Sequence, residues 1–169
     1  VHNILDKIVF ACNLPDLSDD FLFMNDDHFF TEYTDISDYP NYYSELNIKE
    51  FRNAAYREII QDTVKIFENF RFFDIHKPII YNKTKFIEMS KNVPIKDHHL
   101  GLLIKSSYGN FHKIKGTKTT DCILRDHYTL NEINQITKAT DVFSIHDTAI
   151  NQDLINYFDI NYPIHSKFE

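Results

Sequence analysis

The sequence predicts a helix-rich α/β fold with a short, mostly parallel sheet. Three short apolar runs, at 21–24, 72–75 and 142–145, have the length and composition of buried strands, and polar residues follow each one directly. Longer segments between them carry apolar residues at helical spacing, which indicates amphipathic helices. Short strands that alternate with helices are typical of α/β domains.

The first half of the chain begins with a predicted helix over 2–12, because its apolar residues recur every three or four positions. Residues 31–47 are rich in Asp, Tyr, Asn and Pro and predict a long loop. The clearest helix is expected over 48–70. Its apolar stripe consists of Ile48, Phe51, Ala55, Ile59, Ile66 and Phe70.

The second half predicts shorter elements. Pro78 disfavours helix in the residue before it, which supports a strand over 72–75. Thr129 and Glu132 form a capping-box pattern at the start of a helix that reaches residue 139. The other predicted elements are helices at 83–91, 97–108 and 149–158, a loop at 109–121 and the strand at 142–145.

Length and composition favour one soluble domain over residues 1–169. The chain has 43% hydrophobic residues and contains 15 Phe and 10 Tyr, enough for a sizeable core, and it has no internal repeat or flexible linker. No apolar run approaches the roughly 20 residues that a transmembrane helix needs. Cys12 and Cys122 lack metal-ligand spacing and form no disulfide scaffold, which favours a reducing cytoplasm.

The charge and the glycine content argue against a nucleic-acid-binding protein and against a Gly-rich phosphate loop. The formal charge is -7, and no block of Lys and Arg resembles a nucleic-acid-binding face. The three glycines, Gly101, Gly109 and Gly116, do not form a Gly-rich phosphate loop. Side chains, helix N-termini or a divalent cation must therefore hold any phosphate that the protein binds.

The strongest candidate site is the polar run Asn25–Asp27 after the first strand. Ligands of open α/β sheets bind at the carboxyl ends of strands. Asp26 and Asp27 suit Mg²⁺ or Mn²⁺, which prefer oxygen ligands, and we expect Asn25 and His28 to orient them or to bind substrate. The alternative is that the two aspartates only cap a turn.

His76 follows the second predicted strand in the same manner. A neutral imidazole accepts protons near pH 7, so His76 is a candidate general base for an attacking hydroxyl. The alternative is an ordinary loop histidine. The catalytic prediction requires that Asp27 and His76 face one cleft.

Two further groups of residues are candidate substrate contacts. Lys105 offers a point charge to a diphosphate, and Tyr108 and Asn110 offer hydrogen bonds to sugar hydroxyls. Alternatively, Lys105 is a solvated lysine at a helix end. Asp147 follows the third predicted strand, where it closes the site or serves as a helix N-cap.

Four islands of the sequence resemble known proteins. The run 17–30, LSDDFLFMNDDHFF, resembles the Asn-Asp-Asp segment of the Stealth family of capsular-polysaccharide sugar-phosphate transferases. Residues 75–78, IHKP, are similar to the later His-x-Pro segment of that family. Residues 143–150 and 162–169 are similar to the tails of related bacterial capsule and lipopolysaccharide glycosyltransferase-like proteins.

The resemblance implies a nucleotide-sugar-transferase-like (Rossmann-like) architecture, of which this chain is the C-terminal portion. It implies that Asp26 and Asp27 bind metal and donor phosphate, that His76 is catalytic, and that the protein works in the bacterial cytoplasm or at the inner face of the membrane. Two departures stand out. The N-terminal strand with its catalytic aspartate has no counterpart and is expected before Val1. The arginine expected after His-x-Pro is absent, and Lys105 is the candidate substitute.

The leading hypothesis is transfer of a sugar or sugar-1-phosphate from a nucleotide-sugar donor to a glycan hydroxyl. The first rival is a metal-dependent phosphohydrolase, which would release free phosphate without an acceptor. The second is a non-catalytic binding module of the same fold, which would stay inactive with every donor.

Overall fold

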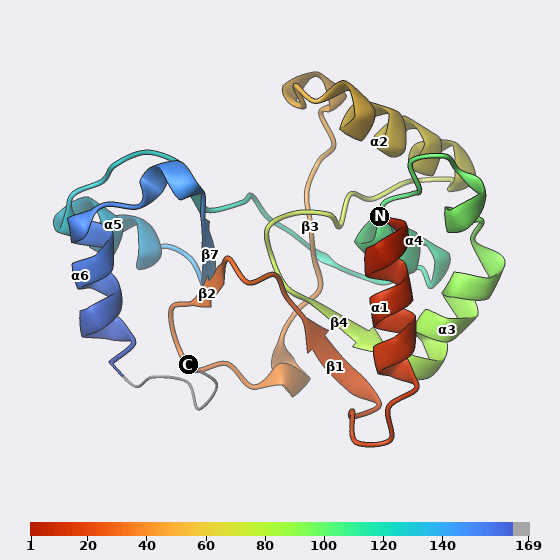
Figure 1. The fold of residues 1–169 in the computed structure, drawn as a ribbon, viewed down its shortest axis with the longest axis horizontal. Coiled ribbons are helices and arrows are strands. Elements are labelled where there is room, and N and C mark those ends of the chain that lie inside the picture. Colours follow the sequence, from red (N-terminus) through yellow and green to blue (C-terminus); the bar gives the residue numbers. More distant parts are fainter. Residues whose placement is uncertain (164–169) are drawn as a thin grey trace. The chain divides into compact units, whose positions relative to one another are not determined.

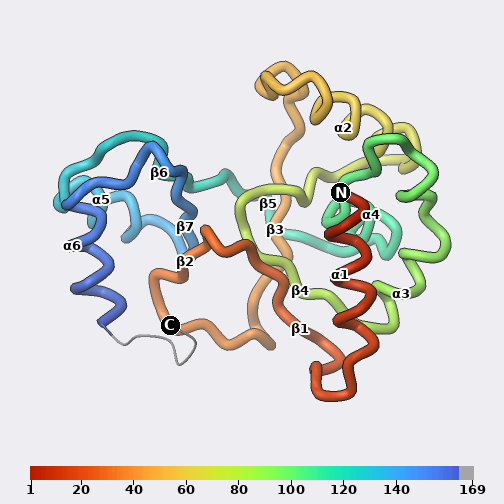
Figure 2. Tube along the Cα trace, viewed as in Figure 1, coloured from red at the N-terminus to blue at the C-terminus, as the bar shows by residue number. Residues whose placement is uncertain are grey.

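The computed structural model describes residues 1–163 and shows a mixed α/β protein, with 44% of its residues in helices and 14% in strands. Figure 1 shows the helices and strands along the chain, and Figure 2 traces the backbone through them. The predicted α/β class is confirmed. Most of the second tail island, residues 164–169, lies outside the described residues.

The chain divides into two compact units. The first contains residues 1–24 and 35–120, and the second contains 25–34 together with the segment that begins at Asp121. Each unit has its own buried core, so the two are described in turn. The expectation of a single domain over 1–169 stays a prediction.

The first unit is built around a two-stranded sheet with two helices beside it. Strand β1 (Asp20–Phe23) pairs antiparallel with β4 (Ile79–Asn82). Helix α1 (His2–Cys12), which starts and ends as predicted, packs against α3 (Lys83–Asn92) (Figure 1). The most buried side chains of this core are Leu5, Ile8, Phe73, Ile79, Tyr81, Phe86, Met89, Ile95 and Leu102.

The pairing of β1 corrects the prediction of a mostly parallel sheet. Among residues 1–163, two strand pairs are antiparallel and two are parallel. The partner of β1 is β4, which the sequence did not predict, because its alternating burial spans only four residues after Pro78. Ile79 and Tyr81 occupy its buried positions and anchor the pair in the core.

Helix α2 (Ala54–Ile66) is shorter than the predicted helix over 48–70. The side chain of Asn53 accepts a hydrogen bond from the backbone N–H of Tyr56 and caps the helix at this point. Phe51 lies before the cap, yet its ring still packs against that of Phe72 with centroids 5.7 Å apart. The apolar stripe thus predicted burial correctly but not the helix boundary.

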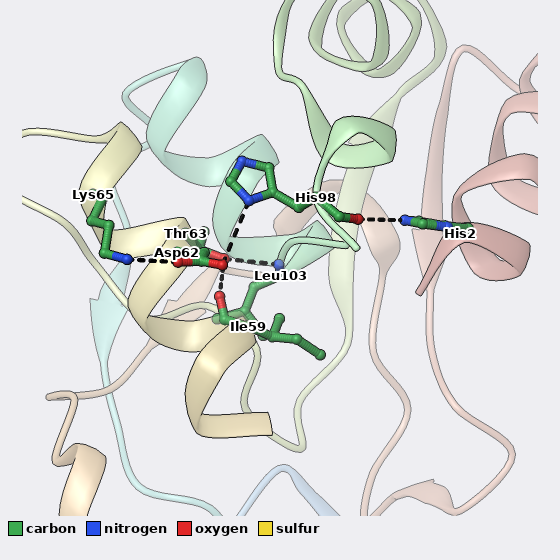
Figure 3. A network of polar contacts seen from close by, with 7 residues as sticks. All are labelled: His2, Ile59, Asp62, Thr63, Lys65, His98 and Leu103. Atoms are coloured by element: carbon green, nitrogen blue, oxygen red, sulfur yellow. Dashed lines mark hydrogen bonds and ion pairs between the residues drawn. The ribbon is translucent and has the colours of Figure 1, made fainter. Parts of the chain in front are cut away.

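Thr63 on α2 contacts the residue that precedes helix α4 (Ile104–Phe111). Its buried hydroxyl accepts a hydrogen bond from the backbone N–H of Leu103 at 3.0 Å, and Asp62 beside it lies 3.6 Å from the ring of His98 (Figure 3). Leu103 stands at the N-cap position, and helix α4 follows it. The helix predicted over 97–108 therefore starts too early.

Two predicted loops each contain a short strand. Strand β3 (Tyr42–Tyr43) pairs parallel with β5 (Thr117–Lys118). A Cβ atom on Gly116 would lie 2.8 Å from the carbonyl oxygen of Asn41, closer than side-chain carbons approach backbone oxygen. Glycine at this position therefore lets the two segments come together.

The second unit has a three-stranded sheet in the order β2 (His28–Phe30), β7 (Val142–Ile145) and β6 (Ile123–Leu124). Strand β7 matches the prediction, whereas β2 and β6 were not predicted. Helices α5 (Leu130–Thr137) and α6 (Gln152–Asn161) pack against each other (Figure 1). The buried core of this unit consists of Leu124, Ile133, Phe143, Ala149, Leu154 and Tyr157.

Helix α5 starts at the predicted capping box. The hydroxyl of Thr129 accepts from the backbone N–H of Glu132, and the Glu132 carboxylate accepts from the N–H of Thr129. Helix α6 begins at Asn151, whose side chain accepts from the N–H of Leu154. No helix among residues 1–163 has both the length and the apolar character that crossing a bilayer requires.

Candidate functional site

The polar run Asn25–Asp27 forms a turn that leads into β2 in the second unit. The backbone N–H of His28 donates to the carbonyl oxygen of Asn25 at 3.3 Å and closes the turn. The N–H of Ile145 donates to the carbonyl of Asp27 at 3.3 Å, which ties the turn to the end of β7. The turn is thus fixed by the sheet that follows it.

The ring of His28 adds a second constraint on the same turn. Its side chain is fully buried, and its Nδ1 atom accepts a hydrogen bond from the backbone N–H of Asn25 at 3.4 Å. With Nδ1 as acceptor, a neutral ring carries its proton on Nε2, which lies 3.8 Å from Oδ1 of Asp27. His28 therefore supports the turn and directs its Nε2 side toward the Asp27 carboxylate, and its predicted contact with a ligand or substrate stays a prediction.

The two aspartates of the turn differ in exposure. Asp26 is exposed, and the side chain of Asp27 retains 29% of its accessible surface. An ion from solvent can reach the Asp26 carboxylate and the exposed part of Asp27, whose Oδ1 atom is buried, and Asn25 is exposed beside them. Two carboxylates fit Mg²⁺ or Mn²⁺, because Mg²⁺ in particular keeps several waters and substrate oxygens in its shell. The metal and its identity stay predictions.

In the first unit, the segment that leads to His76 is not the predicted strand. Only Phe72 makes a strand-like bridge, to Ser44. Several other backbone groups of this segment are paired with side chains of α4. Asn110 accepts from the N–H of Arg71 and donates to its carbonyl, both at 2.8 Å, and the hydroxyl of Ser106 accepts from the N–H of Phe73 at 2.9 Å.

Lys105 holds the backbone on both sides of His76. Its ammonium group is buried and donates to the carbonyl oxygens of Ile75 at 2.6 Å and Lys77 at 2.9 Å. Because these two carbonyls flank His76 in sequence, Lys105 fixes the turn that carries the imidazole. Lys105 is thus no solvated helix-end lysine, and its predicted contact with a diphosphate stays a prediction.

Asp74 completes this arrangement at the start of α4. Its carboxylate accepts from the backbone N–H of Ser106 at 2.7 Å, which is the position of an N-terminal helix cap. Burial raises the pKa of this carboxyl, and the charge of Lys105 and the hydrogen bonds from Ser106 oppose that rise. Asp74 and Lys105 are thus two opposite charges that both hold the segment leading to His76.

Of the remaining predicted contacts on α4, Tyr108 lies in the interior and Asn110 is partly exposed. The hydroxyl of Tyr108 accepts from the N–H of Asn82 at 3.0 Å, and only 2% of this residue is exposed. Burial raises the pKa of Tyr108. A Cβ atom on Gly109 would lie 2.5 Å from the ring of Phe73, so glycine lets that ring lie against the helix. Contacts of Tyr108 or Asn110 with sugar hydroxyls stay predictions.

Asp147 lies in the second unit, in a 3₁₀ turn over Asp147–Ala149 that follows β7. Its side chain is exposed, and the residue that caps the turn is His146, whose Nδ1 accepts from the N–H of Thr148 at 3.3 Å. Asp147 is therefore not the N-cap of this turn, and its predicted substrate contact stays a prediction.

Sequence reasoning missed Asp74 and Ser106. Ser106 and Asn110 are four residues apart and share one face of α4, a spacing visible in the sequence. The signal for Asp74 is weaker, since the residue that it caps lies 32 positions later. No local pattern links the two.

The structure thus defines a mixed α/β protein with two separately supported polar turns. Comparison of the sequence with protein-family descriptions finds no matching family, and comparison with curated proteins finds no match either. The resemblance to the Stealth family therefore depends on the residues of the islands at 17–30 and 75–78.

Proposed function

We propose that this chain is the C-terminal part of the catalytic domain of a metal-dependent sugar-transferring enzyme, related to the Stealth family and Rossmann-like in architecture. The reaction moves a sugar or sugar-1-phosphate from a nucleotide-sugar donor to a hydroxyl of a glycan. Its biological setting would be the synthesis of capsule or another surface polysaccharide.

The observation that carries the proposal is the constrained turn Asn25–Asp27. A buried imidazole and two backbone hydrogen bonds hold it, although Asp26 is exposed and the side chain of Asp27 retains 29% of its accessible surface. Accessible carboxylates on a fixed backbone are what binding of a hard cation requires.

In the proposed reaction, Asp26 and Asp27 hold Mg²⁺ or Mn²⁺, which would neutralise the charge of the donor diphosphate. Asn25 and Asp147, both exposed, are the candidate contacts to substrate oxygens in the second unit. His28 keeps the orientation of Asp27 through its buried ring.

We assign to His76 the role of general base, which accepts the proton of the attacking hydroxyl. Its ring is half-buried and its backbone is fixed by Lys105, which suits a group that must meet an attacking hydroxyl at hydrogen-bond distance. In glycosyl transfer, the acceptor oxygen bonds to the anomeric carbon and the nucleoside diphosphate leaves. In phosphoglycosyl transfer, that oxygen bonds to phosphorus and the nucleoside monophosphate leaves. In both, the proton of the hydroxyl passes to His76.

The test compares two single variants with the unchanged chain. Calorimetry with Mn²⁺ and a panel of nucleotide sugars measures donor binding, and labelled donor with an oligosaccharide acceptor measures turnover. We expect Asp27→Ala to abolish metal-dependent donor binding, and His76→Ala to retain binding but lose turnover. The labelled product distinguishes glycosyl from phosphoglycosyl transfer.

Asp6→Ala is the matched control, because Asp6 is an exposed carboxylate on α1. It should leave both measurements unchanged. Full donor affinity in Asp27→Ala would refute the metal role. Release of free phosphate without acceptor would favour a phosphohydrolase. If the unchanged chain shows no turnover with any donor of the panel, a binding module would be favoured.

A further inference from the structure

The second unit contains a cavity of about 520 Å³ that none of the residues assigned above lines. It lies at the last turns of α5 and α6, the end of β2 and the connection from α5 to β7. Its volume falls within the range of small-molecule sites, roughly 300–1,000 Å³. The lining residues are Thr31, Glu32, Asn134, Thr137, Lys138, Ala139, Thr140, Asp141, Tyr157 and Asn161.

Hydrogen bonds fix the walls of this cavity. The hydroxyl of Thr31 donates to the carbonyl of Thr140 at 2.6 Å, and its backbone N–H donates to the carbonyl of Asp141 at 2.9 Å. The side-chain NH₂ of Asn134 donates to its own helix, and that of Asn161 does the same, each at 2.8 Å. The site is therefore preformed by the fold of this unit.

The electrostatic character of the cavity favours ligands that donate hydrogen bonds. Helices α5 and α6 both end here, and the C-terminal end of a helix carries partial negative charge on its carbonyl groups. The carboxylates of Glu32 and Asp141 outnumber the single ammonium of Lys138. A phosphate would be repelled, whereas the hydroxyl groups of a neutral sugar would find acceptors.

Tyr157 gives the clearest sign that a ligand group belongs here. It is 4% exposed and lines the cavity, and its hydroxyl makes no hydrogen bond with any residue of the described chain 1–163. The neighbouring hydroxyl of Tyr162 instead donates to the carbonyl of Phe30 at 2.5 Å. Burial, with a smaller effect of Tyr157, raises the pKa of Tyr162 to about 12. A nearly buried tyrosine that lines a cavity and has its hydroxyl unbonded among the described residues can bond to a bound polar group.

We propose that this cavity binds one sugar residue of a neutral saccharide, with the Tyr157 hydroxyl and the amide oxygens of Asn134 and Asn161 bonded to sugar hydroxyls. If the proposed transferase function is correct, this sugar belongs to the acceptor glycan. The saccharide site itself needs neither metal nor donor.

The experiment titrates the full chain with free ligands, without metal, and follows binding by NMR. The probes are methyl β-glucoside, methyl N-acetyl-β-glucosaminide and lactose, with inorganic phosphate and putrescine as an anion and a cation for comparison. We expect at least one saccharide to bind and phosphate not to bind. Tyr157→Phe should weaken that saccharide about tenfold, the effect of losing one hydrogen bond, while the thermal midpoint stays unchanged.

Tyr162→Phe is the matched control. It removes the hydroxyl that bonds to Phe30, so it should lower the thermal midpoint and leave saccharide affinity intact. Saccharide affinity unchanged in Tyr157→Phe, binding of phosphate or putrescine in place of sugar, or no binding of any saccharide would each overturn the proposal.

A repeat with Asp27→Ala separates this inference from the proposed function. The saccharide should bind this variant as it binds the unchanged chain, because Asp27 does not line the cavity. Saccharide binding without any transfer activity would leave the site intact and refute the transferase. Transfer activity without saccharide binding at Tyr157 would refute the saccharide site and leave the transferase proposal intact.

Discussion

Helices α4 and α5 both begin at a carboxylate, but the two carboxylates come from different places. At α5, Glu132 belongs to the helix and accepts from the backbone N–H of Thr129, three residues earlier. At α4, the carboxylate is that of Asp74, which accepts from the N–H of Ser106, 32 residues later. One cap is local, and the other is supplied by a distant segment.

The surroundings of the two carboxylates shift their pKa values in opposite directions. Glu132 is exposed, and hydrogen bonds from the backbone and hydroxyl of Thr129 lower its pKa. Burial raises the pKa of Asp74, although Lys105 and Ser106 act against that rise. The exposed cap only starts a helix, whereas the buried one also binds the segment before His76 to α4. The difference shows that the same capping chemistry serves local structure in one unit and tertiary structure in the other.

The largest effect should follow from removing the charge of Lys105. Lys105→Met keeps most of the side-chain volume but leaves the Asp74 carboxylate without its cation and two buried carbonyls without their donor. Breaking such a buried arrangement typically costs about 3–5 kcal/mol of unfolding free energy. Urea denaturation of the variant and the unchanged chain measures this loss.

The control for this variant is Lys91→Met, since Lys91 is exposed on α3. Its effect should stay within about 0.5 kcal/mol. If Lys105→Met lowers the unfolding free energy by less than about 1 kcal/mol, the segment before His76 does not depend on the lysine. The proposed difference between the two caps would then be wrong.

A smaller effect is expected at the local cap. Thr129→Ala removes the hydroxyl that accepts from the N–H of Glu132 and should cost about 1 kcal/mol, the usual value for an N-cap. Thr129→Ser restores the hydroxyl and should recover most of this stability. Urea denaturation again provides the measurement, and equal losses in the Ala and Ser variants would contradict the capping role.

The two caps also explain how far the sequence predicts the structure. The Thr129–Glu132 pattern is contiguous and predicted α5 correctly, as helical spacing predicted α1 and α3. The strand expected over 72–75 was wrong, because its backbone makes only one strand-like bridge, at Phe72, and otherwise bonds to side chains of α4. Such pairing depends on residues far away in sequence, which no local pattern reveals.

The candidate sites were likewise predictable only where their signal is local in the sequence. The turn Asn25–Asp27 was predicted at the correct place, because a polar run after a strand is a local signal. The buried position of His28 and the role of Lys105 were not predicted, since each depends on where a neighbouring segment passes. The cavity beside Tyr157 has no sequence signature, because three separate segments contribute its walls.

The smallest expected difference between the two caps lies in how their contributions to the unfolding free energy depend on pH. Glu132 has a folded-state pKa below its ordinary value of 4.5, so its stabilising contribution is present above pH 4.5 and is lost as the pH falls through the folded-state pKa. Asp74 has a folded-state pKa above 3.8, so its contribution is greatest below pH 3.8 and is lost as the pH rises through its folded-state pKa. Glu132→Gln should therefore reduce the fall in unfolding free energy on acidification, and Asp74→Asn should increase it. Urea denaturation at closely spaced values between about pH 3 and pH 6 measures both slopes. Slopes that change in the same direction would show that burial does not distinguish the two carboxylates.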